Sequence, residues 1–328
     1  MNSSTLSIIK KKTFLQIIFK FIQSNTPLIT LIVLFLFATF RYEYFFSMFN
    51  LVNILRQVSM LGLISVGMTF VILTGGIDLS VGSIMALAGV WAANLSGVSL
   101  TLCFLIPFLI GVFLGFINGL IITKLNITPF LATLAIMIGA RGLAHVSTGE
   151  VSIRIEQLSA GFLLLGKGKI LGIPLPAIIF ILVVVIASFI AKYTKFGRSV
   201  YAVGGNEEAA KVMGLNVNRI KVIVYTISGS LASLAGIILT SRLGAGQPVA
   251  GQGWELDAIA ATVIGGTLLT GGKGKFSGTL LGVLIIGIMT NILNMDKNIN
   301  TWWEYVVKGI VLLIAVIIQS QTEEKKLG

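Results

Sequence analysis

One short pattern occurs twice in this chain, each time between two apolar stretches. Leu73-Thr-Gly-Gly76 is followed by Gly82-Ser83, and Leu269-Thr-Gly-Gly272, 196 positions later, is followed by Gly278-Thr279. Each copy joins the end of one hydrophobic run to the start of the next. A repeated glycine break between hydrophobic segments is typical of transporters with two related halves and interrupted helices.

The composition extends this interpretation to the whole chain. Of the 328 residues, 55% are hydrophobic and 11% are charged, whereas soluble domains carry about 25% charged residues. We therefore predict an all-α polytopic membrane protein with about ten spans. The spans lie near 26–46, 51–73, 80–97, 100–123, 127–147, 172–192, 218–241, 253–270, 276–294 and 302–320. Segments 80–97 and 253–270 are short and glycine-rich, as broken helices are.

The distribution of basic residues predicts the orientation. With the N-terminus inside, 15 of the 24 lysines and arginines fall on the cytoplasmic side. These are Lys10, Lys11, Lys12, Lys20, Lys124, Lys192, Lys195, Arg198, Lys211, Arg219, Lys221, Lys273, Lys275, Lys325 and Lys326. The bias favours cytoplasmic N- and C-termini and an even span count. It also explains the net charge of +12 without a nucleic-acid partner. The first apolar run has no small-residue cleavage site after it, so we expect a retained span rather than a signal peptide.

Two longer polar segments interrupt the spans, an outer loop at 148–171 and an inner loop at 193–217. We expect a single membrane domain over residues 1–328. In the inner loop, Asn206 is a good N-cap, and Glu207 and Glu208 favour a first helical turn. Gly214 would stop the helix after about two turns. Such a helix is a natural docking element for a soluble partner, although an ordinary loop helix is the alternative.

The inner loop also resembles a known motif. Glu208-Ala-Ala210, with Gly214 four positions on, resembles the cytoplasmic "EAA" loop of permease subunits in ATP-binding-cassette (ABC) importers. The apolar-Pro pair that often ends that motif is absent, and Val222-Ile-Val224 stands there instead. The resemblance implies that this segment seats on an ATPase subunit. Its candidate coupling residues are Gly197, Arg198, Gly204, Gly205, Asn206, Glu207, Glu208, Ala209, Ala210 and Gly214.

A closer resemblance covers nearly the whole chain. Several stretches, in order, resemble ribose/xylose/arabinose-type sugar permeases: Thr74–Gly82, Ile127–Leu134, Arg141-Gly142, Val203–Glu207, Glu255–Ala261 and Gly265–Gly274. The resemblance implies an ABC-importer permease fold in the inner membrane. Its implied partners are an ABC ATPase subunit, a periplasmic sugar-binding protein and a second permease copy, as homodimer or heterodimer. Ribose is the first expected substrate, followed by other pentoses and hexoses.

The repeated junctions and nearby polar residues are candidates for the translocation pathway. They are Thr74, Gly75, Gly76, Asp78, Ser80, Asn118, Thr270, Gly271 and Gly272. Asp78 is an acid beside a hydrophobic run, which marks a functional candidate, but it could instead cap the helix that starts near Ser80. Asn118 could equally form an interhelical hydrogen bond. Both junctions are expected on the cytoplasmic side, because they follow the second and eighth spans.

Three glycines in one apolar run predict close helix packing. Gly111, Gly115 and Gly119 recur every four residues, so they form a flat stripe that a neighbouring helix can approach. We expect packing within the subunit, with a subunit interface as the alternative.

Other polar residues have plainer interpretations. Glu255 and Asp257 could contact a polyol, but we expect first-turn acids of the helix that begins near 253. Arg141 and Arg242 could meet a binding protein at the outer face, or be solvated charges. The chain has one cysteine and one histidine, so we expect no metal site. Lys273 is followed by glycine instead of Ser or Thr, which argues against a phosphate-binding loop. We expect neither a cofactor nor enzymatic activity.

Three alternatives remain open at this stage. The substrate could be a nucleoside or a furanosyl signalling molecule. An ion-coupled secondary transporter would need acids deep in its spans, whereas Asp78 and Glu304 stand at span ends. A non-transporting assembly factor would not explain the repeated junctions.

Overall fold

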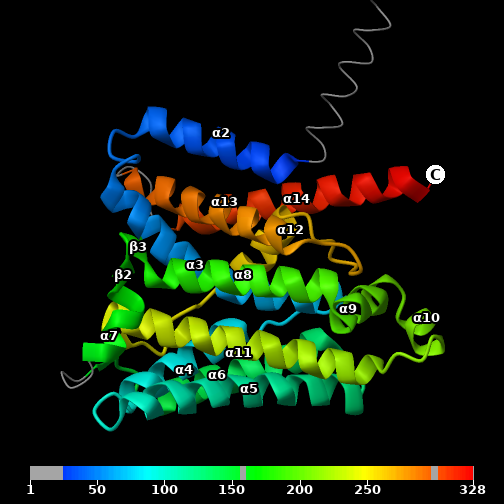
Figure 1. Cartoon of the computed structure of the whole chain (residues 1–328), viewed down its shortest axis with the longest axis horizontal. Coiled ribbons are helices and arrows are strands. Elements are labelled where there is room, and N and C mark those ends of the chain that lie inside the picture. Colours follow the sequence, from blue (N-terminus) through cyan, green and yellow to red (C-terminus); the bar gives the residue numbers. More distant parts are fainter. Residues whose placement is uncertain (1–24, 156–159, 297–301, 328) are drawn as a thin grey trace, which may run out of the picture.

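The computed structural model describes residues 25–155, 160–296 and 302–327, and its long helices lie side by side along the longest axis (Figure 1). The expected N-terminal basic residues Lys10, Lys11, Lys12 and Lys20 lie outside the described residues. At one end of the bundle is helix α10 (Glu207–Val212). At the other end are helix α7 (Ala160–Lys167) and strands β2 (Lys169–Ile170) and β3 (Ile173–Pro174).

Each of the ten predicted segments contains a helix. These are α2 (Thr26–Arg41), α3 (Met48–Leu73), α4 (Val81–Asn94), α5 (Leu100–Lys124), α6 (Pro129–Val146), α8 (Leu175–Tyr193), α11 (Val217–Leu243), α12 (Trp254–Ile264), α13 (Phe276–Met295) and α14 (Trp303–Leu327). Within the described residues, α3, α5, α6, α8, α11 and α13 are long and apolar enough to cross a membrane. The all-α, polytopic class is therefore confirmed, while the count of about ten spans stays a prediction.

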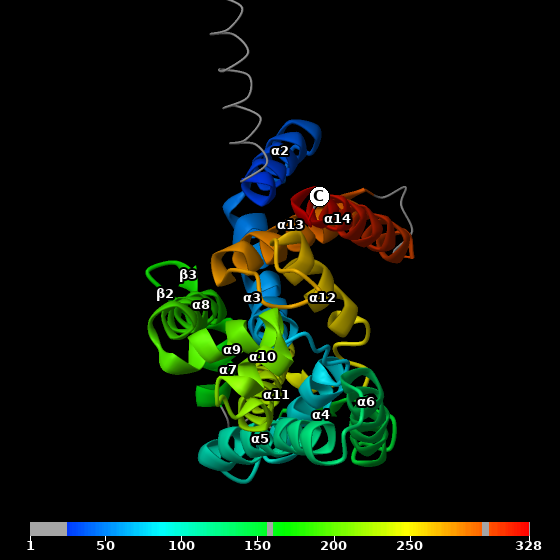
Figure 2. The same cartoon turned by 90° about the vertical axis from the view of Figure 1, so that its right-hand side faces the viewer.

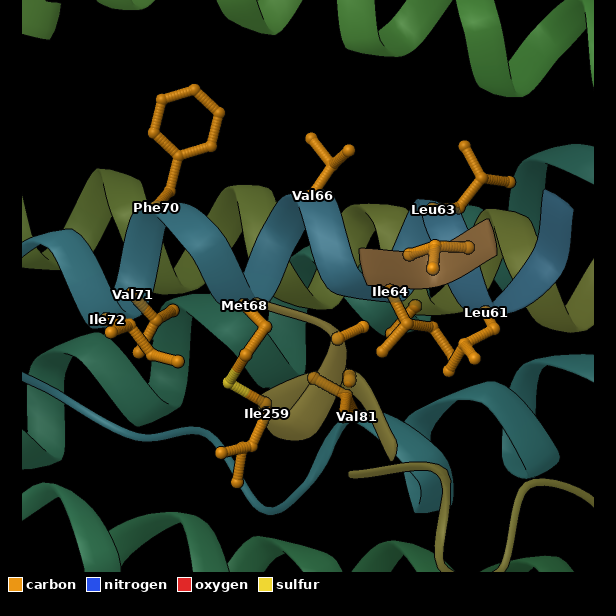
Figure 3. Close-up of a cluster of buried hydrophobic side chains, with 14 of the residues drawn as sticks. Leu61, Leu63, Ile64, Val66, Met68, Phe70, Val71, Ile72, Val81 and Ile259 are labelled. Atoms are coloured by element: carbon orange, nitrogen blue, oxygen red, sulfur yellow. The ribbon is translucent and has the colours of Figure 1, made fainter. Parts of the chain in front are cut away.

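Helix α3 forms the centre of the core. Its N-terminus is capped by the Ser47 hydroxyl, which accepts a hydrogen bond from the Asn50 amide at 3.2 Å. Every residue from Val58 to Leu73 is buried. Figure 3 shows Leu63 and Phe70 on one side of this helix and Met68 on the opposite side, facing Ile259 of α12. A helix that is apolar all round has to be surrounded by others, and α3 is.

The two short, glycine-rich segments are short helices, as predicted. Helix α4 has 14 residues and α12 has 11. Both begin inside the bundle, because a methyl group on Gly82, in the first turn of α4, would overlap the carbonyl oxygen of Gly251, just before α12. The predicted segment 253–270 is helical only to Ile264. Gly265 and Gly266 follow, and Gly266 has φ of +91°.

The glycine stripe of α5 packs against α11, which confirms packing within the subunit. A methyl group on Gly115 would overlap the Tyr225 carbonyl oxygen, and one on Gly119 would lie 2.6 Å from the Val222 Cα. Gly111 lies as tightly against Gly229. The backbones of α5 and α11 therefore approach each other closely along the length of this stripe.

Two segments that the sequence presents as loops contain further structure. In the outer segment, α7 is fixed to the end of α11: Ser241 accepts a hydrogen bond from the Gly166 amide at 2.7 Å and donates one to the Phe162 carbonyl at 2.6 Å. Strand β1 (Ile153–Arg154) pairs antiparallel with β4 (Ala245–Gly246), and β2 pairs with β3. In the inner segment, helix α9 (Lys195–Gly205) precedes α10.

Candidate functional site: the paired junctions and the coupling loop

The first glycine junction turns the chain back into the bundle. Helix α3 ends at Leu73, and Gly75 takes φ of +78°, which favours glycine. The following segment has no regular structure and is held by Thr133 of α6, whose hydroxyl accepts a hydrogen bond from the Leu79 amide at 3.1 Å. Gly76 leaves no room for a side chain, because a methyl group there would overlap the Tyr225 hydroxyl of α11.

The second junction contacts the first directly. Gly271 and Gly272 have φ of +89° and +70°, and the Gly272 amide donates a hydrogen bond to the Leu73 carbonyl at 3.0 Å. The two copies of the pattern, 196 positions apart, therefore lie at the same end of the bundle. This agrees with the prediction that both lie on one side of the membrane; which side it is stays a prediction.

Helix α9 closes onto both junctions. A methyl group on Gly204 would overlap the carbonyl oxygen of Leu73 and lie 2.5 Å from the amide nitrogen of Gly272. The Tyr201 hydroxyl donates a hydrogen bond to the Gly274 carbonyl at 2.9 Å. Within the predicted coupling segment, Gly204 is thus the residue that touches both interrupted helices.

Helix α10 forms as its sequence predicts. The Asn206 side chain accepts a hydrogen bond from the Ala209 amide at 2.9 Å, and Gly214 has φ of +82°. Glu207 pairs with Lys211 at 2.8 Å and with Lys221 of α11 at 2.6 Å. These two lysines, Lys211 foremost, hold the pKa of Glu207 below its ordinary value. The ion pairs anchor α10 to the start of α11.

Several side chains of this predicted coupling segment are exposed to solvent. Arg198 and Glu208 are exposed, as are Val212 (89%) and Met213 (69%). Of the other predicted coupling residues, Gly197 and Ala210 are buried, and Gly205 and Ala209 are exposed. Two large apolar side chains beside charged ones, at the tip of the loop, are the composition of a protein-docking surface.

A second polar cluster lies deeper in the bundle, around Asp78. Its carboxylate accepts hydrogen bonds from the Ser80 amide at 3.0 Å, the Ser80 hydroxyl at 2.6 Å and the Ser228 hydroxyl at 2.8 Å. The Asn118 amide of α5 donates to the Ser80 hydroxyl at 2.9 Å. Asn118 thus makes the interhelical hydrogen bond given as its alternative, whereas Asp78 binds Ser80, the N-cap residue of α4, and does not itself cap the first turn.

The depth of Asp78 differs from the sequence-based expectation. Asp78 stands at a helix end, as expected, but it is completely buried. Its partner Ser228 is the twelfth residue of the 27-residue helix α11, near the middle of that helix. The segment after the first junction returns into the bundle, which the order of apolar runs alone cannot show. The position of Asp78 at a helix end is therefore no argument against a role inside the membrane.

The predicted pathway residues thus form two groups. The junction Thr74–Gly76 meets the second copy at Gly75, which lies against Gly271 and near the Thr270 carbonyl, while Gly272 binds the carbonyl of the preceding Leu73. Asp78, Ser80 and Asn118 form the deeper cluster. Gly271 and Gly272 pack tightly against Gly75, Gly204 and Gly205, and the deeper cluster is buried.

Three charged residues of α12 and α14 form a group that the sequence patterns do not reveal, and α13 adds a hydrogen bond to it. Lys308 of α14 pairs with Asp257 of α12 and with Glu304, both at 2.7 Å. Glu304 also accepts a hydrogen bond from Thr290 of α13 at 2.9 Å. Glu255 and Asp257 are first-turn acids of α12, as expected, but Asp257 is also the ion-pair partner of the last helix. Its spacing to Lys308 has no local pattern that could reveal the pair.

Arg141 is bound to backbone and is not a free charge. Its Nη1 donates hydrogen bonds of 2.7 Å to the carbonyl oxygens of Pro248 and Ala250, in the segment leading to α12. Arg242 is in the last turn of α11, at the end of the bundle where α7 lies. Among the described residues, no group of three His, Cys, Asp or Glu side chains is arranged to hold a metal ion.

Interrupted helices, paired glycine junctions and charged residues inside a bundle of apolar helices define the class of multi-pass membrane transport permeases. Residues 50–316 match the family described as "Branched-chain amino acid transport system / permease component", and the chain belongs to this family. The relatives carry the names of transport permeases and not of enzymes. No solved structure matches the chain.

Three relatives show where within the family the similarity lies. The ribose import permease protein of Bacillus subtilis is 49% identical over 90% of this chain and 92% of its own length. An inner membrane ABC transporter permease protein of Escherichia coli is 40% identical over 91% of this chain and 93% of its own. The L-arabinose transport system permease protein of the same bacterium is 38% identical over 91% of both chains. The chain is thus similar to ABC sugar importer permeases over nearly its whole length.

Proposed function

We propose that this chain is the permease subunit of a binding-protein-dependent ABC importer, which moves ribose or another pentose across the inner membrane. ATP hydrolysis on partner subunits powers the cycle. One observation carries the proposal: Gly204, at the end of α9, packs against both interrupted helices at once. A displacement of the α9–α10 segment would therefore reach both junctions without passing through a flexible connection.

The orientation follows from this role. The α9–α10 end, with both termini, faces the cytoplasm, where Arg198, Glu208, Val212 and Met213 dock on the ABC ATPase subunit. The opposite end, with α7 and the paired strands, faces the periplasmic sugar-binding protein. Residues 1–328 form one permease domain, which works with a second permease, as homodimer or heterodimer.

The predicted pathway residues change partners during the cycle in this proposal. The packed junctions at Thr74–Gly76 and Thr270–Gly272 close the cytoplasmic side in the present conformation. A cycle that separates them would open a route between α3 and α13. Two conformations biased by nucleotide at one end and by loaded binding protein at the other are sufficient for directed transport.

The names of the relatives favour a pentose, because they include a ribose permease and an L-arabinose permease. They also favour ATP over an ion gradient, because one relative is named an ABC transporter permease. A nucleoside or a furanosyl signalling molecule is the alternative substrate, since both contain the same ribose-like ring.

Vesicle transport tests the proposal. The chain is reconstituted with an ABC ATPase subunit and a ribose-binding protein from the same cell, and uptake of radiolabelled ribose is followed with ATP supplied to the ATPase. We expect uptake that needs ATP and survives collapse of ion gradients. Uptake that follows an ion gradient without ATP would contradict the proposal, and stronger competition by nucleosides than by pentoses would move the substrate to the alternative class.

Membrane topology gives an independent check. A reporter fused after Gly205 should show a cytoplasmic signal. A periplasmic signal would contradict docking of the α9–α10 segment on an ATPase.

A further inference from the structure

Two oppositely charged side chains, Arg141 and Glu255, lie near the starts of the two short helices α4 and α12. Arg141 is on α6, a helix long and apolar enough to span the membrane, and Glu255 is in the first turn of α12. The Glu255 Oε2 lies 2.6 Å from the position that a methyl group on Gly82 would occupy, so its carboxylate sits directly against the first turn of α4. Figure 2 shows α14, α12 and α6 one below another along one side of the molecule.

The two side chains attract each other electrostatically but form no ion pair within 4.0 Å among the described residues. Arg141 uses only Nη1, for the carbonyl oxygens of Pro248 and Ala250. Its remaining N–H groups make no hydrogen bond within the described part of the chain. No described side chain donates a hydrogen bond to Glu255. The Arg141 guanidinium therefore keeps unused donors, and the Glu255 carboxylate keeps acceptor capacity that no described side chain uses.

The neighbouring charged side chains do not pair with Arg141 or Glu255. Asp257 and Glu304 are both held by Lys308 at 2.7 Å. Asp78 is completely buried and satisfied by Ser80 and Ser228. Arg141 and Glu255, in contrast, are both only half-buried. Charged side chains within spanning regions almost always face the bundle interior or a water-filled cavity rather than lipid.

We propose that Arg141 and Glu255 form a sugar-hydroxyl contact on the translocation pathway, an inference that rests on the proposed function. One sugar hydroxyl donates to the Glu255 carboxylate, and a neighbouring one accepts from Nε or Nη2 of Arg141. Charge-assisted hydrogen bonds of this kind are about twice as strong as neutral ones. A polyol with adjacent hydroxyls is the ligand class that can bind the Glu255 carboxylate and the Arg141 guanidinium together.

Conservative variants separate this contact from a structural role. Glu255→Gln removes the charge but keeps the size. Arg141→Lys keeps a cation for the Pro248 and Ala250 carbonyls but loses the extra donors. Glu43→Gln is the matched control, because Glu43 is an exposed acid in the short segment between α2 and α3.

The experiment uses the reconstituted complex and measures two quantities for each variant: stimulation of ATP hydrolysis by ribose-loaded binding protein, and ribose uptake. For Glu255→Gln and Arg141→Lys we expect stimulation within about twofold of native and uptake lowered about tenfold, the effect of losing one charge-assisted hydrogen bond. Glu43→Gln should match the native chain in both.

Native uptake in both variants would overturn the inference while leaving the proposed function intact. Loss of stimulation together with uptake would also overturn it, because the residues would then maintain the fold and not contact the sugar. If the native chain itself gives no ribose-dependent stimulation or uptake, the proposed function fails, and the inference fails with it.

Discussion

At the residue scale, Asp78 shows how a buried carboxylate can hold a re-entrant segment. Its three hydrogen bonds connect the start of α4 to the middle of α11, and the Asn118 amide extends the network to α5. A buried acid is tolerated only when its oxygens are well satisfied. The network therefore fixes the end of the re-entrant segment and the start of α4.

Replacing Asp78 should destabilise the protein strongly. Asp78→Leu leaves the Ser80 amide and the Ser228 hydroxyl buried without an acceptor, at about 1–3 kcal/mol each. We expect a loss of about 2–5 kcal/mol, and a smaller one for Asp78→Asn, whose amide oxygen still accepts from Ser80. Thermal unfolding of the purified protein in detergent measures this.

The control for Asp78 is Ser230→Ala, which removes a hydroxyl that only donates to the Thr226 carbonyl of its own helix. It should change stability by less than about 0.5 kcal/mol. If Asp78→Leu were as stable as this control, the network would not be holding the segment.

The attachment of α10 should weaken in acid. Lys211 and Lys221 lower the pKa of Glu207 from its ordinary value of about 4.5. The ion pairs therefore stabilise the folded loop fully above that value and are lost as the pH falls through the lowered pKa. Amide hydrogen exchange of residues 206–215, compared between the native chain and Glu207→Gln at each pH, should differ at pH 7 and converge near pH 3.

The Glu207 carboxylate is about one-third exposed, so its energetic contribution is small and salt weakens it further. A difference between the two chains that is the same at pH 7 and pH 3 would show that the carboxylate charge does not anchor α10.

At the element scale, the glycines determine how closely the helices approach. The α5 stripe has no space for any side chain against α11, whereas Gly139 of α6 has no atom within 4 Å of the position a methyl group would take. Glycine in a helix costs about 1 kcal/mol relative to alanine. At Gly115 the close packing against α11 offsets the lower helix propensity of glycine. At Gly139 no close packing within this subunit offsets it.

This contrast predicts opposite effects of one substitution. Gly115→Ala should destabilise the protein by about 1–3 kcal/mol, because the new methyl group overlaps the Tyr225 carbonyl and forces α5 and α11 apart. Gly139→Ala should be neutral or slightly stabilising. Thermal unfolding of the two variants side by side tests this, and equal effects would argue against the stripe as the closest helix contact.

The elements also show what local sequence can and cannot predict. Helix α10 was predictable because Asn206, the two acids and Gly214 form a complete start and stop signal. Helix α9 was missed because Gly197, Gly204 and Gly205 lower its helix propensity. Thr194, which accepts a hydrogen bond from the Gly197 amide at 3.0 Å, and packing against α8 override that propensity.

At the scale of the whole molecule, hydropathy located the helices but not their depth. The apolar runs predicted all ten helical segments, because each must hide its backbone from lipid. That Asp78 reaches the middle of α11 depends on the backbone path after Gly75, which composition does not encode. The ion pair of Lys308 with Asp257, and the hydrogen bonds of Arg141 to the segment before α12, join parts of the chain that no local pattern connects.

The same scale explains why the two copies of the pattern matter together. Each alone is a glycine break. Only in the folded chain do they share the Gly272–Leu73 hydrogen bond and the contact with Gly204. In the proposed function, this shared contact couples one loop to both interrupted helices.

The most direct test is ribose-stimulated ATP hydrolysis by the reconstituted complex with Gly204→Ala and Gly205→Ala. A methyl group on Gly204 would overlap the Leu73 carbonyl, whereas one on Gly205 would meet no atom within 4 Å. With both variants inserted in the membrane at native levels and still bound to the ATPase, we predict that Gly204→Ala loses stimulation and Gly205→Ala keeps it. Native stimulation with Gly204→Ala would contradict the claim that α9 couples the ATPase to the paired junctions.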